Sequence, residues 1–215
     1  MTRLGKSRDV HLGGLNLRDR AAVNAAIDNG RAAPAARLSL PPDPGYGVVG
    51  ADPGKHGGLV YLDGTGPVAM LPMPLKNDMI DTRTIREFIE QVRPRRICVE
   101  LVHAHPTDGR SRAFSFGRNA GALESALAEY GAPVEKVDPQ RWQNVMLVGL
   151  PRGAATKQSA RRRCAELWPD ANFIQKGCRV PHDGLCDAAL LSAWSLYYSG
   201  VRLSRELPRG AGDLL

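Results

Sequence analysis

The sequence lacks any apolar run long enough to cross a membrane. A membrane-spanning helix takes about 20 consecutive apolar residues, and no uninterrupted stretch of the 215 residues approaches that length. The N-terminal residues also lack the apolar segment of a secretory signal. We therefore expect a soluble, intracellular protein of the cytoplasm rather than a membrane or secreted one.

Paired cysteines are missing as well. The four cysteines occur without any Cys-x-x-Cys pair, so the spacing typical of structural zinc sites is absent. Three of them fall at apolar positions of the expected helices and strands. The predicted state is therefore a reduced structural thiol for Cys98, Cys164, Cys178 and Cys186.

Composition predicts one globular domain with extensions. The chain is 43% hydrophobic and 24% charged, and its net charge of +7 favours an anionic partner. We place the domain at residues 45–200, between a basic N-terminal extension (residues 1–44) and a C-terminal tail (residues 201–215). Residues 16–29 could form a short Ala-rich helix, but the four prolines of residues 31–45 predict a linker. The Arg-rich arm could touch a nucleic-acid backbone or be a disordered tail.

The order of the expected elements limits the fold. Three β-rich runs joined by Gly-containing turns predict an antiparallel meander, and alternating helices and strands follow it. This order predicts an α/β fold: a mixed sheet with an antiparallel β-hairpin meander and flanking helices. The expected strands are 46–52, 57–63, 67–71, 96–100 and 133–137, and the expected helices are 82–91, 115–130, 139–148, 156–168 and 183–198.

Acidic residues occur in apolar settings within these elements. Asp52 ends an apolar run and is followed by a Pro-Gly turn, Glu100 ends another β-rich run, and Asp187 lies inside a helical pattern. An ionised carboxylate in an apolar element is costly unless a positive or hydrogen-bonding group compensates it. Asp183 lies four residues before Asp187, hence on the same helix face. Three or four such carboxylates, converging from two strands and a helix, would suit a divalent cation.

The order of these motifs resembles the RuvC-like Holliday junction resolvases of the RNase H superfamily, and it looks closest to the divergent bacteriophage-type relatives. The motifs that carry this are the Asp-Pro-Gly hairpin, the strand-end Glu and the helix that opens with paired Asp, and they cover residues 46–198. The resemblance implies an RNase H-like fold and a metal-dependent endonuclease that cleaves four-way junctions in branched DNA as a homodimer. Two Mg²⁺ or Mn²⁺ ions about 4 Å apart would activate water and stabilise the leaving oxygen.

The resemblance also assigns roles to the acids. Asp52 and Glu100 would hold metal from neighbouring strands, and Asp187 would close the site from the C-terminal helix. Asp183 is either a further ligand or an ordinary helix N-cap. In many relatives the two helix acids are three residues apart rather than four, which leaves His182 as a neighbour for proton transfer or support.

A basic segment lies between Arg152 and Arg163 and contains no acid. Apolar residues at helical spacing predict an amphipathic helix with a basic outer face, and Thr156 is its expected N-cap. Such a face is either solvated or in contact with phosphate. By resemblance, Lys157 lies near the scissile phosphate. The candidate DNA-binding residues of this segment are Arg152, Lys157, Arg161, Arg162 and Arg163.

Two further segments are candidates for DNA contact. In the resembled family, an aromatic side chain after the strand-end Glu enters the junction, and a helix N-terminus that follows meets phosphate; here Phe114, Phe116, Gly117 and Arg118 occupy that segment. A Phe can stack on bases, although core packing is an equal alternative for either one. Gln143 stands where relatives usually have Lys, so a phosphate contact is either missing or supplied by Arg141.

Two other functions compete with this interpretation. The Asp-Pro-Gly-Lys-His-Gly-Gly stretch also resembles the first phosphate loop of actin-like ATPases and sugar kinases, but their second glycine-rich Asp hairpin and their adenosine-binding motif are not evident in the sequence. A catalytically inactive junction-binding relative would be expected to lack one of the main carboxylates.

Overall fold

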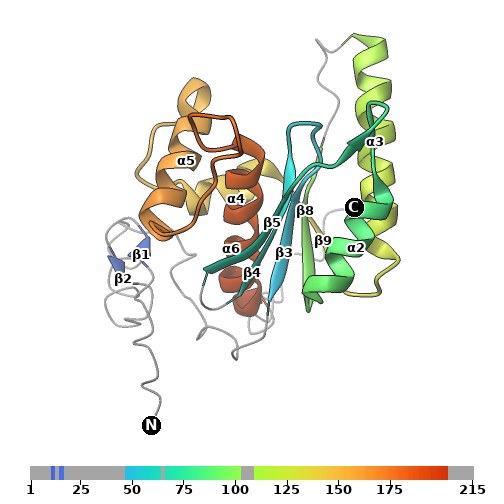
Figure 1. Cartoon of the computed structure of the whole chain (residues 1–215). Coiled ribbons are helices and arrows are strands. Elements are labelled where there is room, and N and C mark those ends of the chain that lie inside the picture. The colour runs from blue at the N-terminus through green and yellow to red at the C-terminus, as the bar shows by residue number, and fades with distance from the viewer. Residues whose placement is uncertain (1–10, 13–14, 17–46, 64–65, 103–108, 203–215) are drawn as a thin grey trace, which may run out of the picture.

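The protein is represented by a computed structural model, which describes residues 11–12, 15–16, 47–63, 66–102 and 109–202 (Figure 1). The short strands β1 (His11–Leu12) and β2 (Leu15–Asn16) pair with each other. The rest of the predicted N-terminal helix, the linker and residues 203–215 of the predicted C-terminal tail lie outside the described residues, whereas residues 201 and 202 belong to the last helix. Within the described part of the chain, no helix is both long and apolar enough to span a bilayer.

A five-stranded mixed sheet forms the centre of the fold, in the order β5-β4-β3-β8-β9. The meander is antiparallel, whereas β8 lies parallel to both β3 and β9. The register of β3 and β8 aligns Ala51 with Val99, so the carboxyl ends of these two strands meet at one edge of the sheet. The strands are β3 (Val48–Asp52), β4 (Gly58–Asp63), β5 (Gly66–Pro72), β8 (Arg96–Glu100) and β9 (Val134–Val137).

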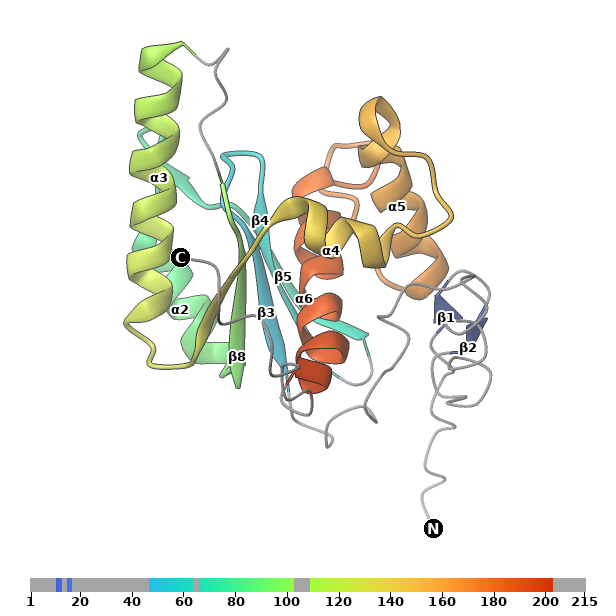
Figure 2. The ribbon, with the colours of Figure 1, turned by 180° about the vertical axis from the view of Figure 1, so that it is seen from behind.

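Helices cover both faces of this sheet (Figures 1 and 2). One face packs against α2 (Thr82–Val92) and α3 (Arg110–Ala128). The other packs against α6 (Asp183–Arg202), with α4 (Pro139–Met146) and α5 (Thr156–Leu167) beside it. Successive residues of a strand point to opposite faces, and accordingly the β3 residue Val48 joins the α6 side of the core whereas its neighbour Val49 joins the α2–α3 side. The predicted α/β fold is confirmed.

Two helix starts differ from the predictions. Helix α3 begins at Arg110 rather than Ser115, because Gly109 has extended backbone angles and no helix breaker separates Arg110 from Ser115. Thr156 is not the N-cap of α5. The 3₁₀ turn η2 (Gly153–Ala155) precedes the helix, so Thr156 already has helical backbone angles and Ala155 occupies the cap without a side-chain hydrogen bond.

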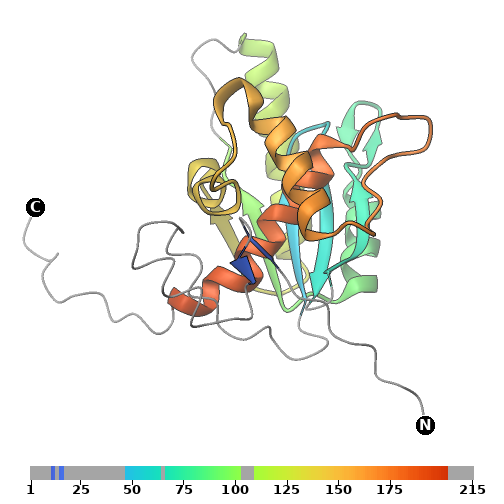
Figure 3. The same cartoon turned by 90° about the vertical axis from the view of Figure 1, so that its left-hand side faces the viewer.

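Helix α6 lies across the sheet (Figure 3), and small residues permit its close contact with the strands. A Cβ atom at Gly50 would lie 2.2 Å from the carbonyl oxygen of Ala188, so only glycine permits this approach. The Ser192 hydroxyl fills the remaining space. It accepts a hydrogen bond from the Gly50 N–H at 2.6 Å. Two carbonyl oxygens lie within reach of its own hydrogen, that of Val60 at 2.8 Å and that of Ala188 at 2.9 Å. These contacts fix the position of α6 over β3 and β4.

We predict that Ser192→Ala destabilises the protein by about 1–3 kcal/mol, because the buried Gly50 N–H loses its acceptor. Urea denaturation followed by circular dichroism measures the change. Ser125→Ala, at an exposed position of α3, serves as the matched control and should change stability by less than about 0.5 kcal/mol. Equal stabilities of the two variants would contradict the role assigned to Ser192.

Candidate active site

Asp52 is the last residue of β3, at the point where the strand reaches the sheet edge. Its Oδ1 accepts a hydrogen bond from the Gly54 N–H at 3.2 Å, which closes the turn formed by Pro53 and Gly54. Burial raises the pKa of the Asp52 carboxyl, and this backbone hydrogen bond opposes the increase only in part. The turn therefore holds Asp52 in a fixed orientation within poorly hydrated surroundings.

Glu100 ends β8, the parallel neighbour of β3. Because Ala51 aligns with Val99, the carboxylates of Asp52 and Glu100 follow at adjacent strand ends. Burial raises the pKa of Glu100 to about 8, and the negative charges of Asp52 and Asp187 add to the effect. The indole N–H of Trp142 faces Glu100 and partly offsets this increase, although it does not reach hydrogen-bond geometry.

Asp187 comes from the first turns of α6 and approaches the same edge of the sheet. A Cβ atom at Gly184 would lie 2.3 Å from the carbonyl oxygen of His56, so the helix start packs directly on the β3–β4 turn. Burial raises the pKa of Asp187 to about 7, and the charges of Asp52 and Asp183 contribute to the increase. Two strands and a helix thus bring three mutually repelling carboxylates together, as predicted from their settings in the sequence.

A cleft of about 1040 Å³ opens beside these carboxylates. Asp52 and Asp187 lie in its wall, whereas Glu100 is not among the lining residues. Cations and apolar side chains also line the wall. The cations are Lys55, Lys157 and Arg161, and the apolar residues include Phe116, Val180 and Pro181.

The described residues contain no group of three or more His, Cys, Asp or Glu side chains arranged closely enough to hold a metal ion as they stand. The donor chemistry nevertheless fits a hard divalent cation, because carboxylate oxygens are its preferred ligands. Burial and the charges of neighbouring acids raise the pKa values of Glu100 and Asp187, so the protein itself stabilises their ionised forms poorly.

Comparison with solved structures identifies the fold. The structure of Thermus thermophilus RuvC in complex with Holliday junction substrate has a TM-score of 0.51 and 17% identity, over 74% of this chain and 96% of that one. The chain has the RuvC fold. A second structure of T. thermophilus RuvC matches with a TM-score of 0.49 and 20% identity, over 69% of this chain and 94% of that one. The yeast mitochondrial Holliday junction resolvase Ydc2 matches with a TM-score of 0.49 and 12% identity, over 86% and 88%. No protein-family model and no curated protein matches the sequence significantly.

His182, and not Asp183, caps the last helix of this RuvC fold. The His182 carbonyl accepts the first helical hydrogen bond, from the Cys186 N–H at 3.1 Å, and its Nδ1 accepts from the Leu185 N–H at 3.2 Å. Burial lowers the pKa of His182, which favours the neutral imidazole that can act as an acceptor. The N-cap alternative for Asp183 is therefore wrong. Asp183 lies in the cleft wall, where it pairs with Arg161 and Lys157.

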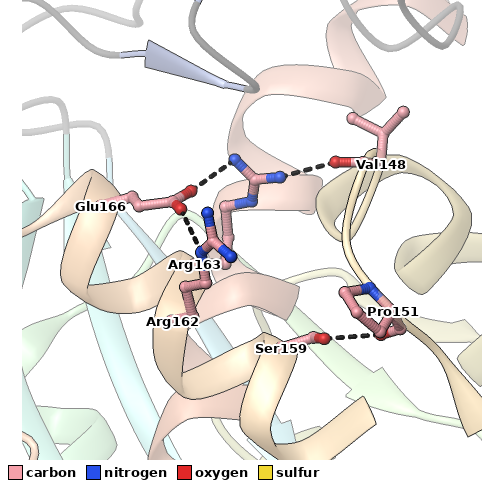
Figure 4. Close-up of polar contacts among 6 residues, drawn as sticks. All are labelled: Val148, Pro151, Ser159, Arg162, Arg163 and Glu166. Carbon is pink, nitrogen blue, oxygen red and sulfur yellow. Dashed lines mark hydrogen bonds and ion pairs between the residues drawn. The ribbon is translucent and has the colours of Figure 1, made fainter. Parts of the chain in front are cut away.

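The basic helix α5 differs from the prediction at one arginine. Arg163 is not on the outer face: its side chain is 2% exposed, and it donates to the Val148 carbonyl at 2.7 Å and to Glu166 at 2.9 Å (Figure 4). The reason is helical spacing, because Arg163 follows buried Ala160 by three positions and so falls on the apolar face. Exposed Arg162 pairs with the same Glu166.

The α4–α5 connection is attached to α5 by this buried arginine and by a serine. The Ser159 hydroxyl donates to the Pro151 carbonyl at 2.5 Å, close to the Arg163 contact with Val148 (Figure 4). Arg152, from the same connection, donates to the side chain of Asn144. These contacts fix the path of the α4–α5 connection up to the start of α5, where Lys157 lies beside the cleft.

The aromatic candidates on α3 occupy different environments. Phe114 is 71% exposed, with the Arg118 guanidinium 5.9 Å from its ring centroid, whereas Phe116 lies in the cleft wall. Core packing is thus excluded for Phe114. Gly117 lies inside α3 rather than at its start, so its N–H is not one of the free amides of a helix N-terminus, and the predicted helix start at this segment is wrong.

Two further cationic residues, Arg141 and Lys55, occupy different surroundings. Arg141, on α4, has its guanidinium 5.6 Å from the ring centroid of buried Trp194. Lys55 was missed by the sequence analysis, although it follows Asp52 in the same turn; it lines the cleft and pairs with Asp78 of the turn between β6 (Leu75–Lys76) and β7 (Met79–Ile80). Its position directly after the Asp-Pro-Gly sequence would have indicated that it lies near Asp52.

The protonation of the carboxylates predicts a pH-dependent stability. Glu100 and Asp187 have folded pKa values of about 8 and about 7, above the value of about 4 in an unfolded chain. Their contribution is fully favourable below about pH 4 and is lost as the pH rises through 7 and 8. In EDTA, the melting temperature should fall between about pH 5 and pH 8, and it should fall less for the Glu100→Gln/Asp187→Asn double variant. Glu90→Gln, at an exposed position, is the control, and identical pH profiles for all three proteins would refute the prediction.

We also predict that Arg163→Ala costs at least about 2 kcal/mol of stability, since it leaves the Val148 carbonyl without its donor and removes buried packing. Arg162→Ala, which removes an exposed partner of the same Glu166, should cost less than about 1 kcal/mol. Chemical denaturation of the two variants gives the comparison. A cost for Arg162→Ala equal to or above that for Arg163→Ala would reverse the assignment.

Proposed function

We propose that this protein is a metal-dependent, structure-selective DNA endonuclease that cleaves four-way junctions by phosphodiester hydrolysis. The observation that carries the proposal is the group of three poorly compensated carboxylates beside a cleft with a basic wall. The RuvC fold supports it, because one structure of that fold is a RuvC bound to Holliday junction substrate.

The proposed metal ligands are Asp52, Glu100 and Asp187. Their oxygen donors fit Mg²⁺ or Mn²⁺. Neutralisation of their charges would relieve the repulsion that raises the pKa values of Glu100 and Asp187. The side chains must move closer together for this, since they do not form a ligand group as they stand. When bound, a pair of divalent ions supplies activated water and stabilises the leaving oxygen.

The cleft residues have separate roles in this proposal. Lys157 and Arg161 offer positive charge to a DNA phosphate near Asp52 and Asp187, with which they share the cleft wall. Lys55 extends the basic wall toward the Asp-Pro-Gly turn. Phe116 supplies an apolar surface on which a base can stack, and this contact would exclude water from the same region.

The assembly proposed for the active protein is a homodimer. A four-way junction requires two symmetric cuts, and a twofold dimer provides two matching sites. The partner would be branched DNA. Of the alternatives, neither the phosphotransferase nor the inactive binding protein is favoured by a feature of the described residues.

The main experiment compares labelled four-way junction, flap and duplex DNA in Mg²⁺, Mn²⁺ or EDTA. We expect junction cleavage with either metal and none in EDTA. Asp52→Asn, Glu100→Gln and Asp187→Asn should each abolish cleavage while retaining junction binding, because each removes a metal-binding charge with little change of shape. Glu90→Gln should cut normally. Cleavage in EDTA, or normal cutting by any of the three variants, would count against the proposed site.

The aromatic residues give a further prediction. Phe114→Ala should leave thermal stability nearly unchanged, because that side chain is 71% exposed. If Phe114 or Phe116 stacks on a base, its replacement by Ala removes about 1–3 kcal/mol of stacking energy. Junction cleavage by that variant should then be slower. Melting curves and junction cleavage on both single variants test this. Normal junction cleavage by both variants would rule out a base contact at either position.

A further inference from the structure

Asp183 binds two cations in the wall of the cleft. Its Oδ1 lies 2.7 Å from Nε of Arg161, and its Oδ2 lies 3.6 Å from Nζ of Lys157. The pair with Arg161 is half-buried, with 32% of the arginine side chain and 26% of the aspartate side chain exposed. One carboxylate thus connects the start of α6 to two basic residues that lie one turn apart on α5.

The three acids proposed as metal ligands have no such partners. In the part of the chain that the structure describes, no ion pair with Lys or Arg involves Asp52, Glu100 or Asp187. A metal bound by Asp183 would have to displace the guanidinium from a short, charge-assisted hydrogen bond. It would also leave Arg161 without its partner beside a divalent ion. The acids at this edge therefore divide into a group of three without a Lys or Arg ion pair and one, Asp183, that is paired with two cations.

The backbone around Asp183 is held firmly. His182 caps the helix immediately before it, and Gly184 packs without space for a Cβ atom immediately after it. The short Asp183 side chain on this fixed backbone therefore has few orientations. Arginine has five N–H donors, so the single bond from Nε orients the guanidinium and leaves four donors for another anion.

We infer that Asp183 is a positioning residue that holds Arg161 and Lys157 toward a DNA phosphate in the cleft, and that it is not a metal ligand. The inference rests on the proposed nuclease function and deepens it. It divides the two acids of α6 between two tasks: Asp187 contributes to the metal site, and Asp183 orders the cations that bind the substrate.

Metal binding by the free protein distinguishes the two roles of Asp183. Mn²⁺ titration followed by electron paramagnetic resonance should give an affinity for Asp183→Asn within about threefold of the wild type, the residual effect being the loss of a nearby charge. Asp187→Asn should lose about tenfold or more, as expected for removal of a ligand. A loss for Asp183→Asn as large as that for Asp187→Asn overturns the inference.

Cleavage kinetics test whether Asp183 acts through its partners. Asp183→Asn should slow single-turnover junction cleavage about tenfold in the wild-type background, but by less than about twofold in an Arg161→Gln/Lys157→Met background, because its partners are then already absent. A full tenfold effect in both backgrounds would show that Asp183 acts independently of the two cations, which overturns the inference.

A third measurement needs neither metal nor DNA. In a urea double-mutant cycle, Asp183→Asn and Arg161→Gln should couple, changing the unfolding equilibrium by about two- to fivefold, as expected for a partly exposed ion pair. Zero coupling overturns the inference alone. A wild-type protein that neither binds Mn²⁺ nor cuts junctions would instead overturn the proposed function, and this inference with it.

Discussion

The close packing of α6 on β3 and β4 is the contact on which the site depends. Asp52 belongs to the sheet and Asp187 to the helix, so their separation is set by how closely the two elements approach. Gly50 and Gly184 have no side chains, and a Cβ atom at either position would keep the helix and the sheet apart. Ser192 accepts the hydrogen bond that the Gly50 N–H donates across this contact. A larger residue at either glycine would move one carboxylate away from the other.

The close packing of α6 on the sheet also places acidic side chains near one another in buried surroundings. Burial raises the pKa values of Asp52, Glu100 and Asp187, and the negative charges of neighbouring acids add to each increase, so the folded protein holds acidic groups in an environment that disfavours their ionised forms. Such a cost is typical of a functional site rather than of a stabilising one. Arg163 is also buried, but its guanidinium donates to Glu166 and to a backbone carbonyl, so this charge has partners within the protein.

The sequence predicted the fold and the convergence of the carboxylates well, for physical reasons. Strand ends marked by Asp-Pro-Gly and by Glu100 are local signals, and parallel pairing brings them to one edge without further information. The environment of Arg163 was predicted wrongly because a charged residue next to exposed Arg162 is ordinarily assigned to solvent, although its spacing of three from Ala160 places it on the apolar face. Local patterns also could not separate Asp183 from His182 as the cap, because both residue types can accept from a helix N-terminus and only the hydrogen bonds in the structure decide.

The distance along the chain between Asp52 and Asp187 has a consequence for biosynthesis. These residues are more than half the chain length apart, and α6 covers the face of β3 and β4 that would otherwise expose Val48, Val60 and Leu62. Non-local contacts of this kind form late, after the intervening loops have closed. A nascent chain therefore has its first acid and its sheet hairpin long before its third acid. The carboxylate site is completed only when the last helix docks, so the correctly folded core and the assembled site arise in the same step.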